Sequence, residues 1–210
     1  MKLVIGSKHL SSWSLRGWLA CKQSGLPFEE EVVPLFDADW PQRRLGDDLA
    51  PSAGIVPVLW DGDVVVWDSL AILEYLGDKV GPDRFWPRAL DARGLARSMV
   101  AEMHSSFHPL RRQWPVNLHL FGATRKLDAE GQGDVLRILT LWAEARARFG
   151  SGGPFLFGSF SAADIAFAPV VTRFRSYGLT VPGFAQAYMD AVWEHDWMQA
   201  WAKAAAEEAA

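Results

Sequence analysis

The sequence has little of several features that would direct it to particular functions. One cysteine, Cys21, among 210 residues excludes an internal disulfide framework and a cysteine-rich zinc site. The longest apolar runs, such as Val64–Trp67 and Phe155–Phe157, are far shorter than the roughly 20 residues of a membrane-spanning helix. The beginning of the chain lacks the long apolar core of a signal peptide. We therefore expect a cytoplasmic protein without a membrane partner.

Positive charge is also not in excess. The chain has 21 Lys and Arg against 25 Asp and Glu, a net charge of −4, whereas broad binding to nucleic acid needs a basic surface. Tryptophan, in contrast, is abundant, with 11 residues. Most of these rings are expected in the core, and a surplus can line a pocket for apolar ligands. We expect no nucleic-acid partner.

The first half of the chain alternates strand and helix patterns. Lys2–Gly6 is typical of a strand, and Ser14–Ser24 of a helix that stops at Gly25. Phe28–Val33 predicts a second strand, and its three acidic residues indicate an exposed edge. A crossover helix between two strands makes them parallel.

A hairpin follows. Val56–Trp60 and Asp63–Trp67 flank Asp61-Gly62, which predicts two antiparallel strands joined by a tight turn. Asp68-Ser69 then caps a helix that Gly77 closes. A parallel pair and a hairpin in one sheet predict a mixed α/β domain over residues 1–80.

Beyond a Gly- and Pro-containing linker at residues 81–87, only helical patterns remain. Apolar residues recur at spacings of three and four from Leu95 to Leu110 and again from Val135 to Phe149. These patterns predict an all-helical domain over residues 88–210, with a tail from Lys203 to Ala210 that is expected to fray.

Three motifs in order carry a family resemblance. They are Ser11–Arg16 between the first strand and first helix, Val56–Leu59 followed by Asp68-Ser69, and Phe157–Ile165 in the helical half. Together they resemble the cytosolic glutathione transferase superfamily over essentially the whole chain. The resemblance implies a thioredoxin-like N-terminal domain with a mixed four-stranded sheet and an all-α C-terminal helical domain. Ser11–Arg16 is similar to the serine classes, namely tau, zeta and their bacterial relatives.

The serine motif suits the chemistry of a thiol. A helix start presents unpaired N–H groups and a partial positive charge, and a Ser hydroxyl there can donate a hydrogen bond to a thiolate. An isolated Ser pair before a helix is usually only a cap, but the other motifs lead us to interpret Ser11 and Ser12 as catalytic. Ser14 remains an alternative. Trp13 stands where zeta-like sequences have Cys, and this difference weakens the case for a zeta-type isomerase activity.

The second motif is interpreted as the glutathione site that the resemblance implies. Pro57 resembles the family's cis-proline, which would let Val56 pair its backbone with the cysteinyl unit of glutathione as an added strand. Ser69 would bind the γ-glutamyl carboxylate and Asp68 the glutamyl ammonium group. Asp68 departs from the Glu or Gln usual at that position.

The glycine carboxylate of glutathione has no obvious partner. Ile55, counted with the binding residues by position, stands where many relatives have Lys or Gln. A cation must come from elsewhere, and we assign Arg43, with His9 and Arg44 as alternatives. The third motif, Ser161 to Asp164, is a capping box to which we give no catalytic role.

An acceptor pocket is predicted from the first long helix after the linker. By resemblance, Phe107, Arg111 and Trp114 would line it together with Trp13, although core packing is the simpler role of aromatic rings. His104 and His108 have the spacing of two metal ligands on one helix, but there is no obvious third ligand, so no metal is expected.

The sequence therefore predicts a glutathione transferase that activates the glutathione thiolate for attack on a small, largely apolar electrophile. Glutathione is the co-substrate, and the resemblance implies a homodimer. Two alternatives stay open: a glutathione-dependent cis-trans isomerase similar to maleylacetoacetate isomerase, and a non-catalytic protein that binds glutathione or apolar ligands.

Overall fold

The computed structural model describes residues 1–208, which form two compact units. The first unit contains residues 1–85 and the described residues from Trp201 on, and the second contains Trp86–Ala200. The end of the chain thus groups with the first unit rather than with the helical domain predicted over residues 88–210.

The first unit is built on a four-stranded sheet of order β2-β1-β3-β4. β1 (Lys2–Gly6) pairs in parallel with the edge strand β2 (Glu29–Val33), because α1 (Ser12–Ser24) crosses between them. β3 (Val58–Asp61) pairs antiparallel with both β1 and β4 (Val64–Trp67). The predicted mixed four-stranded sheet is confirmed.

The hairpin turn lies one residue further along than predicted. Asp61 pairs with Val64, so the turn residues are Gly62 and Asp63, and Gly62 has a φ of 60°. Glycine adopts such a φ at no steric cost, which favours placing it inside the turn. The strand also begins later than expected, which leaves Val56 and Pro57 in the loop before β3.

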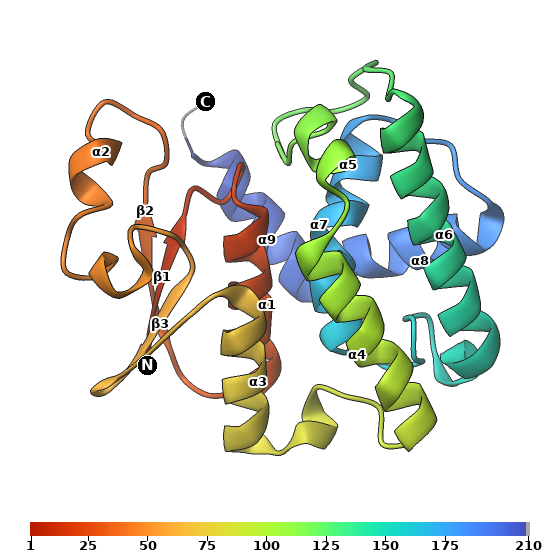
Figure 1. The fold of residues 1–210 in the computed structure, drawn as a ribbon, viewed down its shortest axis with the longest axis horizontal. Coiled ribbons are helices and arrows are strands. Elements are labelled where there is room, and N and C mark those ends of the chain that lie inside the picture. The colour runs from red at the N-terminus through yellow and green to blue at the C-terminus, as the bar shows by residue number, and fades with distance from the viewer. Residues whose placement is uncertain (209–210) are drawn as a thin grey trace. The chain divides into compact units, whose positions relative to one another are not determined.

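The helices α1 and α3 (Ser69–Val80) lie side by side against the sheet (Figure 1). Because strand side chains alternate between faces, Val4 points away from its buried neighbours Leu3 and Ile5. A second apolar cluster therefore forms from Val4, Val33, Leu49, Val56 and Val58. The long connection from β2 to β3 contains the short helices α2 (Trp40–Arg43) and η1 (Ala50–Ser52).

The second unit is helical, as predicted. η2 (Pro82–Arg84) precedes it, and its elements are α4 (Leu90–Ser105), α5 (His108–Gln113), α6 (Ala129–Phe149), η3 (Gly150–Gly152), α7 (Ala162–Ser176), α8 (Gly183–Glu194) and the start of α9 (Asp196–Ala206). Fourteen residues of α7 are buried, so this helix forms the centre of the unit. Its start is held by Asp164, whose carboxylate accepts the Ser161 N–H at 2.8 Å and the Leu156 N–H at 3.1 Å.

The periodic stretch from Leu95 to Leu110 is not one helix. It breaks at Phe107, which has a φ of 63° and precedes α5. Pro109 supplies the reason, since it has no N–H and its ring would clash with the Ser105 carbonyl in a continuous helix. The break also separates His104 and His108, which therefore do not share a helix face.

Candidate active site

The N-terminus of α1 lies at the end of the loop that follows β1. Ser11 is its N-cap, with φ −92° and ψ 98°, and the Ser11 Oγ accepts the Ser14 N–H at 3.2 Å. No acidic side chain lies in the first helical turn. The positive end of the helix dipole is therefore not neutralised from within the helix, and an anion is favoured there.

Ser14 constrains the direction of the Ser11 hydroxyl. The two Oγ atoms lie 2.8 Å apart, and Ser14 Oγ also accepts the Gly6 N–H at 2.9 Å. Ser14 is fully buried, and within residues 1–208 its own proton has no other acceptor. A hydroxyl can rotate, so either serine can be the donor. The Ser11 hydroxyl borders a cavity and the Ser14 hydroxyl does not, so an anion bound there would favour Ser14 as the donor and direct the Ser11 proton to the anion.

A cavity of about 220 Å³ opens beside these serines. Its lining comes from the start of α1, the segment after β2 and the loop before β3, and consists of Leu10, Ser11, Ser12, Trp13, Leu35, Phe36, Trp40, Gly54, Ile55 and Val56. The Ser12 hydroxyl has no hydrogen-bond partner in the described part of the chain. Two serine hydroxyls thus stand at a largely apolar wall, where a hydrogen bond to an anion is stronger than in water.

Val56 brings an unpaired stretch of backbone to the same cavity. Within the described residues, its N–H and C=O have no hydrogen-bond partner, and its peptide bond to Pro57 is cis. Buried backbone groups are almost always paired, so these two are suited to an extended peptide ligand. Gly17 of α1 fits against Pro57, because a Cβ there would lie 2.8 Å from the Pro57 Cγ.

Asp68 and Ser69 are found at the start of α3, as expected. The Asp68 Oδ1 accepts the Leu70 N–H at 2.8 Å, and Asp68 has a φ of 74° with ψ 134°. Such a backbone conformation is strained for a residue other than glycine and is frequent at ligand sites. Ser69 is buried at the first helical position. Neither residue is among those that line the cavity next to Ser11.

The contacts of the proposed cations favour Arg44 over Arg43. Arg43 binds Asp37, lies 3.7 Å from the Asp39 carboxylate and donates to the Pro34 carbonyl. Arg44 is exposed and its guanidinium packs against Gly54, at the cavity wall.

His9 is likewise engaged, by the Glu208 carboxylate at 2.5 Å. Ile55 lines the cavity and is 62% exposed, so it offers apolar contact and no charge.

The residues predicted for the acceptor pocket belong to different environments. Trp13 lines the cavity, and the Arg16 guanidinium lies 4.7 Å from the centre of its ring. Phe107 and Trp114 are buried in the second unit, where Trp114 stacks on Tyr177. Core packing thus accounts for both rings.

Two arginines of the second unit lie close together. The Arg111 guanidinium donates to the carbonyls of Ser106 and Met103. Sequence reasoning missed the second, Arg173, which is 4% exposed and donates to the carbonyls of Trp114 and Pro169. Burial, with Arg111 nearby, lowers the pKa of Arg173 to about 9. Among the described residues it has no acidic partner. No sequence signal marked it, because α7 is apolar around it.

Other reactive groups do not compete with this site. Burial raises the pKa of the Cys21 thiol to about 12, so at neutral pH it is not a nucleophile. Within residues 1–208, no group of three or more His, Cys, Asp or Glu side chains is arranged to hold a metal ion. In the same range, no helix combines the length and apolar character needed to cross a bilayer.

Comparisons with known proteins agree with this geometry. The glutathione S-transferase N-terminal domain model matches residues 10–79, and the corresponding C-terminal domain model matches residues 128–206. Glutathione S-transferase 1 of Dianthus caryophyllus is 34% identical over 116 residues, which are 52% of this chain and 49% of that protein. A glutathione S-transferase of Triticum aestivum is 31% identical over 119 residues, 56% of this chain and 53% of that protein. The chain thus matches about half the length of these plant relatives.

Solved structures match over the full length. A glutathione transferase homologue from Burkholderia, solved with bound glutathione, has a TM-score of 0.72 at 22% identity and covers 99% of this chain and 98% of its own. Maleyl pyruvate isomerase, a bacterial zeta-class enzyme, has a TM-score of 0.73 at 23% identity with 100% of both chains covered. The two domain models in order, together with this fold, show that the chain belongs to the glutathione S-transferase family.

Proposed function

We propose that this protein is a serine-type glutathione transferase, and that Ser11 donates a hydrogen bond to the glutathione thiolate. The observation that carries the proposal is the position of Ser11 at the N-terminus of α1 beside the cavity, in contact with a Ser14 hydroxyl that can act as the donor and release the Ser11 proton to the thiolate. Glutathione is the co-substrate that fits the unpaired Val56 backbone, with Ser69 and Asp68 for its γ-glutamyl end and Arg44 for its glycine carboxylate.

Thiolate stabilisation is the main contribution that these residues would make. A free thiol has a pKa of about 8.5, and lowering it by about two units requires roughly 2.7 kcal/mol of differential stabilisation. A charge-assisted hydrogen bond and a helix N-terminus together supply an effect of that order. The bound thiolate then attacks an electrophilic carbon: an S–C bond forms, the leaving group departs with its electron pair, and the thiol proton has already passed to solvent.

Turnover of a chlorodinitrobenzene with glutathione tests the proposal. We expect the wild type to be active and Ser11→Ala to have a kcat/KM at least about tenfold lower, which is equivalent to about 1.4 kcal/mol of lost transition-state stabilisation. Ser12→Ala is the matched control, since its hydroxyl lies in the same wall. Full activity of Ser11→Ala, with loss in Ser12→Ala, would assign the role to Ser12.

A second function, glutathione-dependent isomerisation of an unsaturated carboxylic acid, is favoured by Arg173. A buried guanidinium that is paired only with carbonyls favours an anionic ligand. Arg173→Met should abolish inhibition of the transferase reaction by small dicarboxylates. If dicarboxylates do not inhibit the wild type at all, this second function is excluded.

We also propose a cytoplasmic homodimer with a substrate-binding region in residues 88–210, as in the family the chain belongs to. Sedimentation equilibrium tests the assembly. A single species of 23.3 kDa at all concentrations would exclude the dimer.

A further inference from the structure

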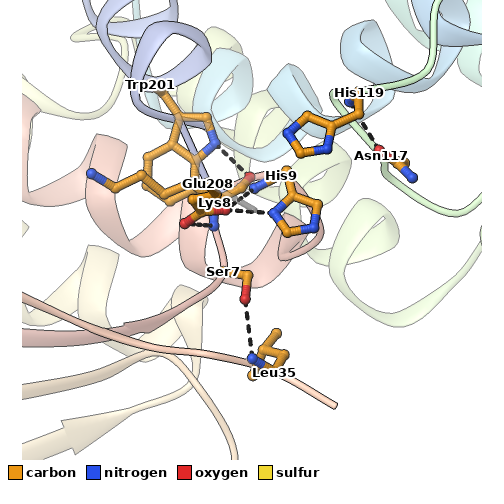
Figure 2. A network of polar contacts seen from close by, with 8 residues as sticks. All are labelled: Ser7, Lys8, His9, Leu35, Asn117, His119, Trp201 and Glu208. Carbon is orange, nitrogen blue, oxygen red and sulfur yellow. Dashed lines mark hydrogen bonds and ion pairs between the residues drawn. The ribbon is translucent and has the colours of Figure 1, made fainter. Parts of the chain in front are cut away.

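The loop from Ser7 to Ser11, which leads into α1, is held by a segment some 200 residues away. One oxygen of the Glu208 carboxylate accepts the Lys8 N–H at 2.7 Å, and the other accepts the His9 N–H at 2.9 Å (Figure 2). The second oxygen also contacts the His9 Nδ1 at 2.5 Å. A single carboxylate therefore binds three nitrogens of two consecutive residues.

Trp201 also binds this loop, through the carbonyl group of Lys8. Its indole N–H donates to the Lys8 carbonyl at 3.0 Å, and the Lys8 ammonium lies 5.5 Å from the centre of its ring (Figure 2). Trp201 in turn packs against Trp18 of α1, with ring centres 5.4 Å apart. The Lys8 ammonium also pairs with Glu30 at 2.5 Å. We call Trp201–Glu208 the latch segment.

The loop lacks an internal substitute for these contacts. The Ser7 carbonyl accepts the N–H groups of Leu10 and Ser11, but within the described residues the Lys8 N–H has no backbone acceptor. Lys8 and His9 are at least nine-tenths buried. Without Glu208, the buried Lys8 and His9 N–H groups would lose their hydrogen bonds to its carboxylate, which destabilises this loop conformation.

The carboxylate is suited to remain charged. Burial raises the pKa of Glu208, but the hydrogen bonds from the Lys8 and His9 N–H groups and from the His9 ring outweigh burial, so its pKa lies below the ordinary value. A charged acceptor forms stronger hydrogen bonds to N–H groups than a neutral one. The contact therefore persists at neutral pH.

We propose that Glu208 is a positioning residue for the thiol site, and that the latch segment fixes the loop so that the Ser11 hydroxyl keeps its place at the cavity wall. The inference rests on the proposed function. The expected fraying of residues 203–210 is not found for residues 203–208, because α9 continues to Ala206 and the Glu208 carboxylate is hydrogen-bonded. Residues 209–210 lie outside the described residues.

The test compares Glu208→Ala and Glu208→Gln with the neighbouring Glu207→Ala. Glu207 is exposed and its side chain has no partner among the described residues, so it matches the charge change without the contact. The ultraviolet absorbance of the thiolate in the glutathione complex, titrated with pH, gives the thiol pKa. Affinity for S-methylglutathione, which has no thiol, and unfolding by urea are measured in parallel.

We expect the thiol pKa to rise by about one unit in Glu208→Ala, from about 6.5 to about 7.5, which makes the thiolate fraction at pH 7 roughly threefold smaller, with a smaller rise in Glu208→Gln. Glu207→Ala should match the wild type. Trp201→Phe, which keeps an aromatic ring but removes the N–H donor and part of the buried ring system, should shift the pKa in the same direction. S-methylglutathione affinity should change less than about threefold, since a thioether does not use the serine.

Two results would overturn the inference. An unchanged thiol pKa with reduced stability would make Glu208 only a structural tie, and a lower pKa would show that its charge opposes the thiolate. If the wild type itself does not shift the thiol pKa, the proposed function fails instead, before the variants are compared.

Discussion

Replacing Ser14 by alanine should separate the two roles of its hydroxyl. The variant removes the acceptor of the Gly6 N–H, which is 2.9 Å away in the wild type, and removes the hydroxyl that lies 2.8 Å from the Ser11 Oγ. The Ser14 backbone N–H remains, so Ser11 still caps α1. One buried N–H loses its partner, which predicts a loss of about 1–3 kcal/mol in the free energy of unfolding.

The same substitution should also weaken the thiolate interaction. A hydrogen bond received from Ser14 polarises the Ser11 hydroxyl and makes it a stronger donor, by roughly 10–30%. We therefore expect the thiol pKa of bound glutathione to rise by about half a unit, less than in Ser11→Ala. Urea unfolding gives the stability, and pH titration of the thiolate absorbance gives the pKa.

Ser24→Ala is the matched control in the same helix. Ser24 is also buried, and its hydroxyl donates to the Cys21 carbonyl and accepts the Leu26 N–H, away from the cavity. This variant should lose comparable stability and keep the wild-type thiol pKa. If Ser14→Ala also keeps that pKa while losing stability, Ser14 is only an anchor for Gly6 and the orientation argued for Ser11 is wrong.

Three further substitutions test other parts of the account. Gly17→Ala places a Cβ 2.8 Å from the Pro57 Cγ, so it should cost about 1–3 kcal/mol in urea unfolding and weaken glutathione binding in calorimetry. Unchanged affinity for glutathione would show that the close approach of Gly17 to Pro57 is not needed for the binding site. Arg44→Ala should raise the KM for glutathione up to about fivefold, which is the range of an exposed ion pair. The KM for γ-glutamylcysteine should stay unchanged, because this thiol lacks the glycine carboxylate. An equal rise in KM for both thiols would exclude Arg44 as the partner of the glycine carboxylate. Burial raises the pKa of Asp164 to about 6, so the folded state binds this proton more tightly than the unfolded state. The tighter proton binding contributes on the order of 3 kcal/mol to the free energy of unfolding below about pH 4, and this contribution is lost as the pH rises to about 6. The pH dependence of urea unfolding should lack this component in Asp164→Asn.

Much of the first unit could be predicted because its signals are local. Gly25 has a φ of 70° at the end of α1, and glycine is the residue that adopts it readily. Asp68 caps α3 through its own side chain, again within a few residues. The same local reasoning failed where a competing residue decided the outcome. Pro109 broke the periodic run after Ser105, and the Asp61–Val64 pair moved the hairpin turn by one residue.

The site was only partly predictable, for a different physical reason. Ser11, Ser12 and Val56 could be proposed because their motifs are contiguous, and the cavity brings these three together. Arg173 and Glu208 could not, since neither belongs to a motif. Their significance depends on partners distant in sequence, such as Trp114 for Arg173 and the Lys8 N–H for Glu208. Arg44 could be preferred to Arg43 only after the contacts of both were known.

Whether Ser11 stabilises the glutathione thiolate is decided by the thiol pKa of glutathione bound to the wild type, to Ser11→Ala and to Ser12→Ala. We expect a pKa about two units below that of free glutathione in the wild type, with most of the shift lost in Ser11→Ala and kept in Ser12→Ala. An unshifted thiol in the wild type, or a full shift in Ser11→Ala, would contradict this role of Ser11.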